Sequence, residues 1–571
     1  MEKVWKVKDK KGNFNPPILE KYHPVILKLL VNREIEKESE IEKYFNFDYE
    51  KDLSDAFSVL GIRKAVERII QAGKNKEKIA IFADYDADGV SAAAVLYESL
   101  VNLGFKDVIC YIPDRQSEGY GMNLSAINYL ADKKVKLIIT VDCGITNIKE
   151  VEKAKNLGIE VIITDHHHAL PKIPEALATI DPSMPCSGFV FKNLAGVGVA
   201  FKLAQALYQK MAPAKIEQLK WSLDLAAIGT IADCVTLLGE NRILVKYGLI
   251  VISKTKRVGL QELFKVGRIK ISEDNPADAR KIAFQISPRI NAAGRMDHAN
   301  ASFKLLIEND PVLARDLALE IENKNQLRQK VTAEIFREVE VLARNSFKNK
   351  KFIFAENSNW PVGILGLVAG KITEEFGKPT AVFQRQKKEF VGSFRSLPEI
   401  NIIKIIEKCS ELLIKFGGHS QAAGVSVKPE NIEKFYDKIS QLIEKELEGK
   451  ETTPILNIDC EIGAGDISWE LAYEIKKMEP FGTGNIEPVF LARNMLVSDS
   501  KIVGNGSKHL KLSIRSEDGS PKIFDAIGFS LAERFSQIKK DDRIDIVFNI
   551  RQDEWNGSQK IQLRLIDLKL K

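Results

Sequence analysis

From Lys78 onward, the pattern of apolar and polar residues predicts strands that alternate with helices. Four short apolar segments read as strands, and each is followed by a polar loop and a helical stretch: KIAIFA (78–83), DVICYI (107–112), KLIITV (136–141) and EVIIT (160–164). Their spacing of about 25 residues is typical of right-handed βαβ units, which form parallel sheets. We therefore predict an α/β domain built on a parallel sheet.

An aspartate follows each of these four predicted strands: Asp84, Asp114, Asp142 and Asp165. A single aspartate after a strand is often only the N-cap of the next helix, and for any one of them that alternative stays open. Ligands of open parallel sheets gather outside the carboxyl ends of the strands. Four aspartates in succession therefore favour a shared site over four caps.

The first of these loops, DYDADG, carries Asp84, Asp86 and Asp88 at alternate positions. Three carboxylates within five residues repel one another, and a hard divalent cation such as Mg²⁺ or Mn²⁺ is the usual partner that stabilises them. An EF-hand is excluded, because position twelve is Val95 instead of glutamate and a strand precedes the loop. A solvated acidic turn without metal remains the alternative.

Two later loops and one helix add further candidate ligands. The segment TDHHH places three of the seven histidines directly after Asp165, which either orients a histidine or binds metal itself. Asp233 lies in an otherwise apolar helical segment, where either a metal or a salt bridge to a nearby basic residue would stabilise it. The mixture of several aspartates with histidine predicts a two-metal centre, which suits phosphoryl transfer.

Composition limits the class of protein without identifying it. At 571 residues the chain is long enough for about three domains. The net charge of +6 permits a local nucleic-acid groove but does not argue for one. We expect a cytoplasmic protein, because there is no secretion signal and no long apolar run, and the six cysteines form no CxxC pair. We also expect a monomer.

The pattern divides the chain into five parts. We predict a helical segment over 1–75 that packs against or leads into the first domain, and a parallel-sheet α/β domain over 76–307. A connecting helix over 308–348 leads to a smaller α/β domain over 349–450. Short alternating strands over 451–571 predict an OB-like β-barrel, a fold that binds single strands.

Several motifs resemble known families. DYDADG, VDCG, the DHH triplet and GTIADC are similar to the four motifs of the DHH phosphoesterase superfamily. Within it, five further motifs resemble the RecJ family of bacterial single-strand-specific exonucleases: IPDRQSEGYG (112–121), SPRINAAGRMD (287–297), GSFRS (392–396), FGGHSQAAG (416–424) and PFGTGNIEPVF (480–490). The resemblance runs nearly end to end.

The resemblance implies a function for the whole chain. It implies a DHH domain, a DHH-associated domain and an OB-like domain, which together degrade single-stranded DNA in the 5′→3′ direction to 5′-mononucleotides. The implied setting is DNA repair and recombination, with a RecQ-type helicase and a single-strand-binding protein as partners. Two alternatives remain: a DHH phosphodiesterase acting on short oligoribonucleotides, and a non-catalytic single-strand-binding relative.

The resemblance also implies roles for individual residues. Two Mn²⁺ or Mg²⁺ ions would be held by Asp84, Asp86, Asp88, Asp142, His166 and Asp233, and the catalytic residues would be His167 and Asp165. Asp84 is our substitute for a histidine that related pyrophosphatases carry where this chain has Phe82. The substrate contacts would be Arg115, Arg289, Asn291, Arg295, Ser393, Arg395 and His419, with Lys508, His509, Lys511 and Trp555 in the barrel. For the arginines the alternative is an ordinary ion pair, and for His419 a turn.

Overall fold

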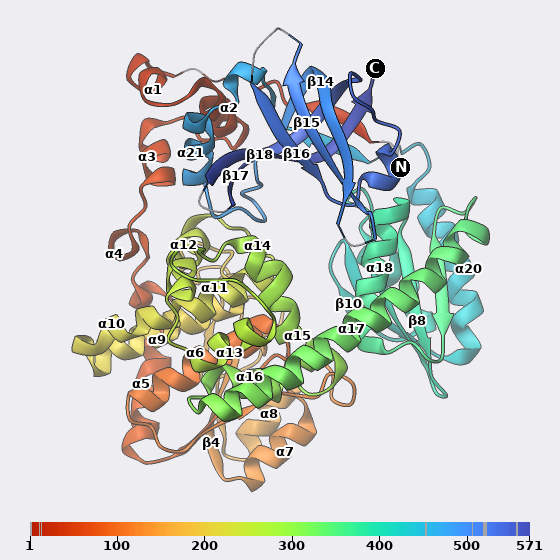
Figure 1. The fold of residues 1–571 in the computed structure, drawn as a ribbon. Helices are drawn as coiled ribbons and strands as arrows, with labels where there is room; N and C mark the ends of the chain where they lie inside the picture. The colour runs from red at the N-terminus through yellow and green to blue at the C-terminus, as the bar shows by residue number, and fades with distance from the viewer. Residues whose placement is uncertain are drawn as a thin grey trace. The chain divides into compact units, whose positions relative to one another are not determined.

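The computed structural model describes residues 3–10, 12, 14–450, 454–504, 506–517, 522–555 and 558–571, without the side chains of 553–558. The chain forms two compact units (Figure 1). One unit comprises residues 53–453, and the other combines residues 2–52 with residues 454–571. Each unit is described separately.

The first unit contains the predicted parallel sheet. Its strands are β2 (Lys78–Ala83), β3 (Val108–Tyr111), β4 (Val135–Val141), β5 (Glu160–Thr164) and β6 (Ala178–Ile180), and all neighbours in the order β3-β2-β4-β5-β6 are parallel. All four predicted strands are confirmed, and the sheet contains a fifth strand, β6, that was not predicted. Because the chain order reverses between β2 and β4, the loops after these two strands flank a switch point, where open α/β sheets bind ligands.

Helices cover both faces of this sheet. They are α5 (Ile62–Lys74), α6 (Ala87–Asn102), α7 (Leu124–Asp132), α8 (Ile148–Asn156), α9 (Gly196–Met211), α11 (Leu223–Ala232), α12 (Gly239–Ser253), α13 (Val258–Val266), α15 (Ser287–Met296) and α16 (Asn300–Ile307). The helices α6, α9 and α11 pack on one another. The helices α7 and α8 share a separate apolar cluster with the sheet that includes Phe82 and Ile138.

The predicted connecting helix is α17 (Pro311–Asn345), which is continuous over 35 residues (Figure 1). It begins at Asp310, whose carboxylate accepts hydrogen bonds from the amides of Val312 and Leu313. It leads to a second sheet in the order β10-β11-β9-β8-β7. The strands are β7 (Ile353–Asn357), β8 (Thr380–Arg385), β9 (Phe390–Arg395), β10 (Leu413–Gly418) and β11 (Ala422–Val427), with helices α18 (Val362–Phe376), α19 (Ile402–Glu407) and α20 (Ile432–Glu446).

The second unit contains the predicted barrel. Its strands are β14 (Phe490–Val503), β15 (His509–Ser516), β16 (Ile523–Gly528), β17 (Arg543–Trp555) and β18 (Ser558–Leu570). The order β14-β15-β16-β18-β17 closes because β17 also pairs with β14. A closed barrel removes the exposed sheet edges that open sheets carry.

We predicted that residues 1–75 pack against or lead into the first domain. Residues 2–52 belong to the same compact unit as residues 454–571, and residues 53–75 to the unit of the first domain. Strand β1 (Val4–Val7) pairs in parallel with β12 (Ile455–Ile458). Helices α2 (Pro24–Asn32) and α3 (Glu38–Phe45) contribute side chains to the same apolar cluster as α21 (Trp469–Lys477) and the barrel. The apolar face of α2 therefore completes the core of the C-terminal barrel, whereas α5 packs on α9 and β6 of the first unit.

Two further features concern the whole chain. Among the residues that the structure describes, no helix has the length and apolar character needed to span a bilayer. The six cysteines are free thiols.

Candidate metal centre and substrate site

The carboxyl ends of β2 and β4 place Asp84 and Asp142 beside each other. Both are almost fully buried, with exposures of 5% and 2%. Asp142 adopts a left-handed backbone conformation, with φ of 61°, which turns the chain sharply at the end of β4. Gly196 lies so close that an added Cβ would stand 2.5 Å from Asp142 Oδ1. The helix α9 therefore approaches this carboxylate closely.

The other two aspartates of the acidic loop begin helix α6. Asp86 is the N-cap, and its Oδ1 accepts hydrogen bonds from the amides of Asp88 and Gly89 at 2.9 and 3.0 Å. Asp88 accepts hydrogen bonds from the amides of Gly196 and Val197 at the start of α9, at 2.7 and 2.9 Å. A helix N-terminus favours a nearby anion, so α9 partly stabilises this buried carboxylate.

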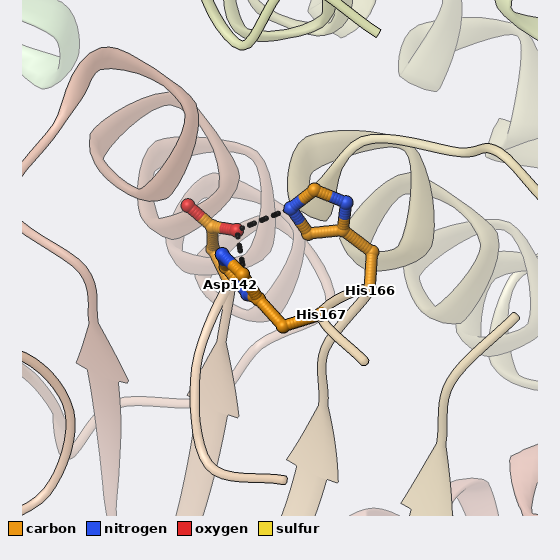
Figure 2. Close-up of side chains that lie close together, drawn as sticks. All are labelled: Asp142, His166 and His167. Carbon is orange, nitrogen blue, oxygen red and sulfur yellow. Dashed lines mark ion pairs between the residues drawn. The ribbon is translucent and has the colours of Figure 1, made fainter. Parts of the chain in front are cut away.

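His166 joins these carboxylates to Asp233. Its Nε2 lies 3.1 Å from Asp142 Oδ1 (Figure 2). The same nitrogen lies 3.6 Å from Asp233 Oδ2 and 4.0 Å from Asp88 Oδ2. Among the described residues, neither His166 Nε2 nor Asp142 Oδ1 has a hydrogen-bond partner, and the same holds for Asp84 Oδ1. Buried polar atoms without partners are costly, and cations bound by the cluster would satisfy them.

Three overlapping groups of side chains present ligand atoms within 4.8 Å of one another. The groups are Asp84, Asp86 and Asp142; Asp88, His166 and Asp233; and Asp142, His166 and His167. The structure thus brings together all six sequence-predicted metal ligands. Carboxylate oxygens with imidazole nitrogen form a donor set that fits Mn²⁺ or Mg²⁺.

The electrostatics of the cluster also favour a bound cation. Burial and neighbouring carboxylates hold the pKa values of Asp84 and Asp142 well above the usual range. Burial, followed by repulsion from Asp86, raises the pKa of Asp88 to about 7. Burial, followed by repulsion from Asp88, raises the pKa of Asp233 to about 9. Without a cation these carboxylates cannot all ionise, so the residues fit divalent metal.

Asp165 is engaged in a different way. Its Oδ1 accepts hydrogen bonds from His167 Nδ1 at 2.8 Å and from the amides of His166 and His167. Its Oδ2 accepts a hydrogen bond from the amide of Ile145 at 2.9 Å. Burial is the largest single influence on Asp165 and opposes its ionisation, but the hydrogen bond and charge of His167 and the amide of Ile145 together lower its pKa. These contacts favour the orienting role that the sequence left open over metal ligation.

Three of the predicted arginines lie near the acidic cluster and near one another. The Arg115 guanidinium stacks 4.9 Å from the ring centroid of Tyr85. Arg295 donates to the carbonyl of Gly363, and Arg395 donates to Ser393 Oγ at 3.2 Å and to the carbonyl of Phe394. Burial, followed by repulsion from Arg115, lowers the pKa of Arg295 to about 10, and the same two causes lower that of Arg395.

None of these three arginines has a carboxylate within 4 Å among the described residues. Partly buried guanidinium groups that repel one another favour a bound anion, and phosphate matches their geometry. Ser393 lies between Arg395 and helix α18, where Gly366 leaves room for both side chains. The predicted contacts Arg115, Arg295, Ser393 and Arg395 therefore make up a candidate anion site.

Other predicted contacts have different surroundings. Arg289 Nε donates to Glu322 Oε2 at 2.6 Å, which matches the ordinary ion pair that we kept as the alternative. Asn291 Oδ1 accepts a hydrogen bond from the amide of Ala87 at 2.9 Å and so helps to position the acidic loop DYDADG. The ring centroids of His419 and His168 lie 6.3 Å apart. The hairpin of β10 and β11, which carries His419, therefore lies beside the loop after β5 that carries the three histidines.

Some predicted side chains lie outside the cluster. Asp114 does not join it, because its Oδ1 accepts hydrogen bonds from Gln116 and Ser117 of its own loop. Phe82 is fully buried and stacks on Tyr111, which excludes it from metal binding. In the second unit, Lys508 and Lys511 are exposed, His509 is half-buried, and the side chain of Trp555 is outside the described residues.

One residue near the cluster was absent from our predictions. Tyr120 Oη lies 3.0 Å from His167 Nδ1 and donates to the carbonyl of Asp142 at 3.2 Å. Two sequence signals could have found it: its place between Gly119 and Gly121, and its position within the motif IPDRQSEGYG (112–121).

Comparison with known proteins identifies three domain families along the chain. The DHH family N-terminal domain matches residues 78–230, the DHHA1 domain matches residues 349–445, and the RecJ OB domain matches residues 458–567. The order agrees with the parallel-sheet domain, the second sheet and the barrel described above.

Relatives match across nearly the whole chain. The single-stranded-DNA-specific exonuclease RecJ of Bacillus subtilis is 36% identical over 95% of this chain and 68% of its own length. RecJ of Haemophilus influenzae is 30% identical over 95% of this chain and 96% of its own length. Both matches therefore include the DHH, DHHA1 and barrel regions.

Solved structures agree with this similarity. RecJ from Thermus thermophilus in complex with Mn²⁺ aligns with a TM-score of 0.82 and 26% identity, over 99% of this chain and 79% of that chain. An exonuclease RecJ bound to manganese aligns with a TM-score of 0.59 and 32% identity, over 69% of this chain and 98% of that chain. On sequence, domain order and fold, this chain belongs to the RecJ family of single-stranded-DNA-specific exonucleases.

Proposed function

We propose that this chain is a metal-dependent exonuclease that degrades single-stranded DNA from its 5′ end and releases 5′-mononucleotides. The observation that carries the proposal is the acidic cluster of three overlapping ligand groups beside an arginine site without carboxylate partners. Metal-binding carboxylates next to phosphate-binding arginines form a site for phosphodiester hydrolysis.

Two Mn²⁺ or Mg²⁺ ions would occupy the cluster. Asp84 and Asp86 would hold one ion, and Asp88, His166 and Asp233 would hold the other. Asp142 would contribute to both sites, because it groups with Asp84 and Asp86 and also with His166. When bound, two such ions activate water and stabilise the charge that develops on the phosphate oxygens. The amides of Gly196 and Val197 keep Asp88 oriented for this task.

His167 would act as the general acid. Asp165 holds its Nδ1, which leaves the other ring nitrogen to give a proton to the leaving oxygen. Burial is the largest single influence and works against protonation, but the hydrogen bond to Asp165 and the charges of Asp165, Asp233 and Asp84 together raise the pKa of His167 to about 9. A ring that keeps its proton near neutral pH has one to donate.

The arginine site would select the end of the strand. A terminal 5′-phosphate carries more charge than an internal phosphodiester, so Arg115, Arg295 and Arg395 with Ser393 would bind it preferentially. Anchoring the terminal phosphate there would place the first phosphodiester at the metal cluster. This arrangement supports 5′→3′ polarity and release of one nucleotide at a time.

The rest of the chain and its partners would supply the strand. The barrel carries exposed Lys508 and Lys511 on and beside β15, and OB-folds bind single strands through such basic surfaces. We propose that a RecQ-type helicase and a single-strand-binding protein deliver the substrate during DNA repair and recombination. We also propose that the protein works in the cytoplasm, where bacteria keep their DNA.

Digestion of end-labelled oligonucleotides tests this function. Purified protein with Mn²⁺ or Mg²⁺ is given single-stranded DNA labelled at the 5′ or 3′ end, duplex DNA, and RNA of the same sequence. We expect labelled mononucleotide at the earliest times only from 5′-labelled single-stranded DNA. Early mononucleotide from the 3′ label would overturn the polarity, and faster digestion of short RNA would overturn the substrate class.

A further inference from the structure

We propose that Tyr120 is a positioning residue for the reaction. Its hydroxyl fixes the position of the His167 imidazole relative to the loop that carries Asp142. This inference rests on the proposed role of His167. Tyr120 Oη lies 3.0 Å from His167 Nδ1 and 3.2 Å from the carbonyl oxygen of Asp142. One hydroxyl thus connects the general acid to the backbone of the central metal ligand.

The hydrogen-bond roles follow from the partners. Asp165 Oδ1 accepts from His167 Nδ1 at 2.8 Å, so Nδ1 carries a proton. The carbonyl of Asp142 can only accept, so the hydroxyl proton of Tyr120 points to it. The oxygen of Tyr120 then accepts a second branch of the Nδ1–H bond. Nδ1 is held from two sides, and only the other ring nitrogen is left for proton transfer.

The loop that carries Tyr120 is built to hold it in place. Gly119 and Gly121 flank it with φ values of 85° and 79°, a left-handed conformation that glycine adopts without strain. An added Cβ at Gly121 would lie 2.8 Å from Asn147 Oδ1. Asn147 also bonds both the amide and the carbonyl of Met122, at 3.1 and 3.0 Å. Loop 119–122 is therefore fastened to the loop after β4 that carries Asp142.

The ring of Tyr120 adds a second contact. It meets the imidazole of His167 edge-on, with 5.5 Å between the ring centroids. The residue as a whole is 44% exposed even though its hydroxyl is bonded. Since the hydroxyl and the ring both contact His167, the two contributions can be separated by substituting phenylalanine, which removes only the hydroxyl.

A double-mutant cycle of Tyr120→Phe and His167→Ala tests this inference by hydrolysis of 5′-phosphorylated single-stranded DNA. We expect Tyr120→Phe to lower kcat about 10-fold with little change in KM, because a mispositioned acid affects the transition state and not binding. In the His167→Ala background it should lower kcat no further, because it acts through His167. The control is Tyr44→Phe, which removes a buried hydroxyl bonded to Asn485 and should cost stability without lowering kcat.

A second readout is independent of catalysis. In metal-free protein, we expect Tyr120→Phe to shift the ¹⁵N resonance of His167 Nδ1 while the thermal midpoint stays near that of the parent. An unchanged kcat in active protein would overturn the inference, as would the same loss of kcat with and without His167. Absence of nuclease activity in the parent would instead overturn the proposed function and leave the ¹⁵N shift to decide on the contact.

Discussion

At the scale of single residues, the site depends on carboxylates that the protein alone cannot stabilise. Asp142 is 2% exposed, belongs to two of the three ligand groups, and has an oxygen without a hydrogen bond. Asp165, by contrast, is fully buried yet bonded through both oxygens. Two buried aspartates at the ends of neighbouring strands thus have opposite surroundings, which favour metal binding for Asp142 and an orienting role for Asp165.

Removing a metal ligand or the general acid should abolish hydrolysis without unfolding the protein. We expect Asp142→Asn and His167→Ala each to lower kcat by about 10²- to 10⁴-fold. Asp114→Asn is a matched control, because Asp114 also follows a strand but bonds only its own loop. Near-parental turnover of either site variant in Mn²⁺, with circular dichroism unchanged, would remove that residue from the site.

The same carboxylates should make metal-free protein sensitive to pH. The folded-state pKa values of Asp88, Asp233 and His167 are raised to about 7, 9 and 9, so between pH 6.5 and 9 the folded state binds more protons than the unfolded state. The free energy of unfolding should therefore fall as pH rises through this window. The lowered pKa of His166, about 4, acts below this window.

Denaturant melts in a chelator at several pH values measure this effect. Asp233→Asn should reduce the slope, and Mn²⁺ should stabilise the protein more at pH 8.5 than at pH 6.5, because binding displaces protons. A stability that rises from pH 6.5 to 9 without metal would contradict the raised pKa values.

At the scale of elements, the spacing of apolar residues predicts which segments form strands and helices. It does not predict which distant segments those elements pack against. All four parallel strands and the long helix α17 follow from local patterns. The partner of residues 2–52 lies more than 400 residues away, and an amphipathic helix does not specify which apolar surface it covers. Similarly, Asp114 and Asp142 look alike after a strand, and only the strand order places Asp142 at the switch point.

Truncating the apolar face of α2 should destabilise the barrel unit. Leu29 is fully buried in the cluster shared with α21 and the barrel, so Leu29→Ala should cost about 2–5 kcal/mol. Leu19→Ala is the control, because Leu19 is 53% exposed and should change stability by less than about 0.5 kcal/mol. Native-state hydrogen exchange of β14 and β17 amides measures the difference, and unchanged protection in Leu29→Ala would contradict the shared core.

At the scale of the whole molecule, the chain combines a metal cluster, an anion site and a single-strand-binding fold. The first unit supplies the cluster from its parallel sheet and part of the anion site from β9 of its second sheet. The second unit supplies the barrel that matches the RecJ OB domain. The candidate metal and anion sites therefore lie within one compact unit, and the fold typical of strand binding lies in the other.

Recognition of the strand end should depend on the arginine site. We expect Arg395→Ala to lower kcat/KM on 5′-phosphorylated single-stranded DNA by about 10- to 100-fold, because charged hydrogen bonds of about 1.5–3 kcal/mol are lost. Activity on the same strand with a 5′-hydroxyl should fall much less. Arg385→Ala is the control, because Arg385 at the end of β8 pairs with Glu356. Equal losses on both substrates would place Arg395 outside end recognition.

The central claim is that bound divalent metal at the acidic cluster performs the hydrolysis. Native mass spectrometry can count Mn²⁺ ions per chain during a titration of chelator-treated protein, while the same samples are assayed on single-stranded DNA. The expected result is two ions per chain, hydrolysis that rises with their occupancy, and the loss of both in Asp142→Asn. Hydrolysis by metal-free protein, or two ions still bound with full activity in Asp142→Asn, would contradict the claim.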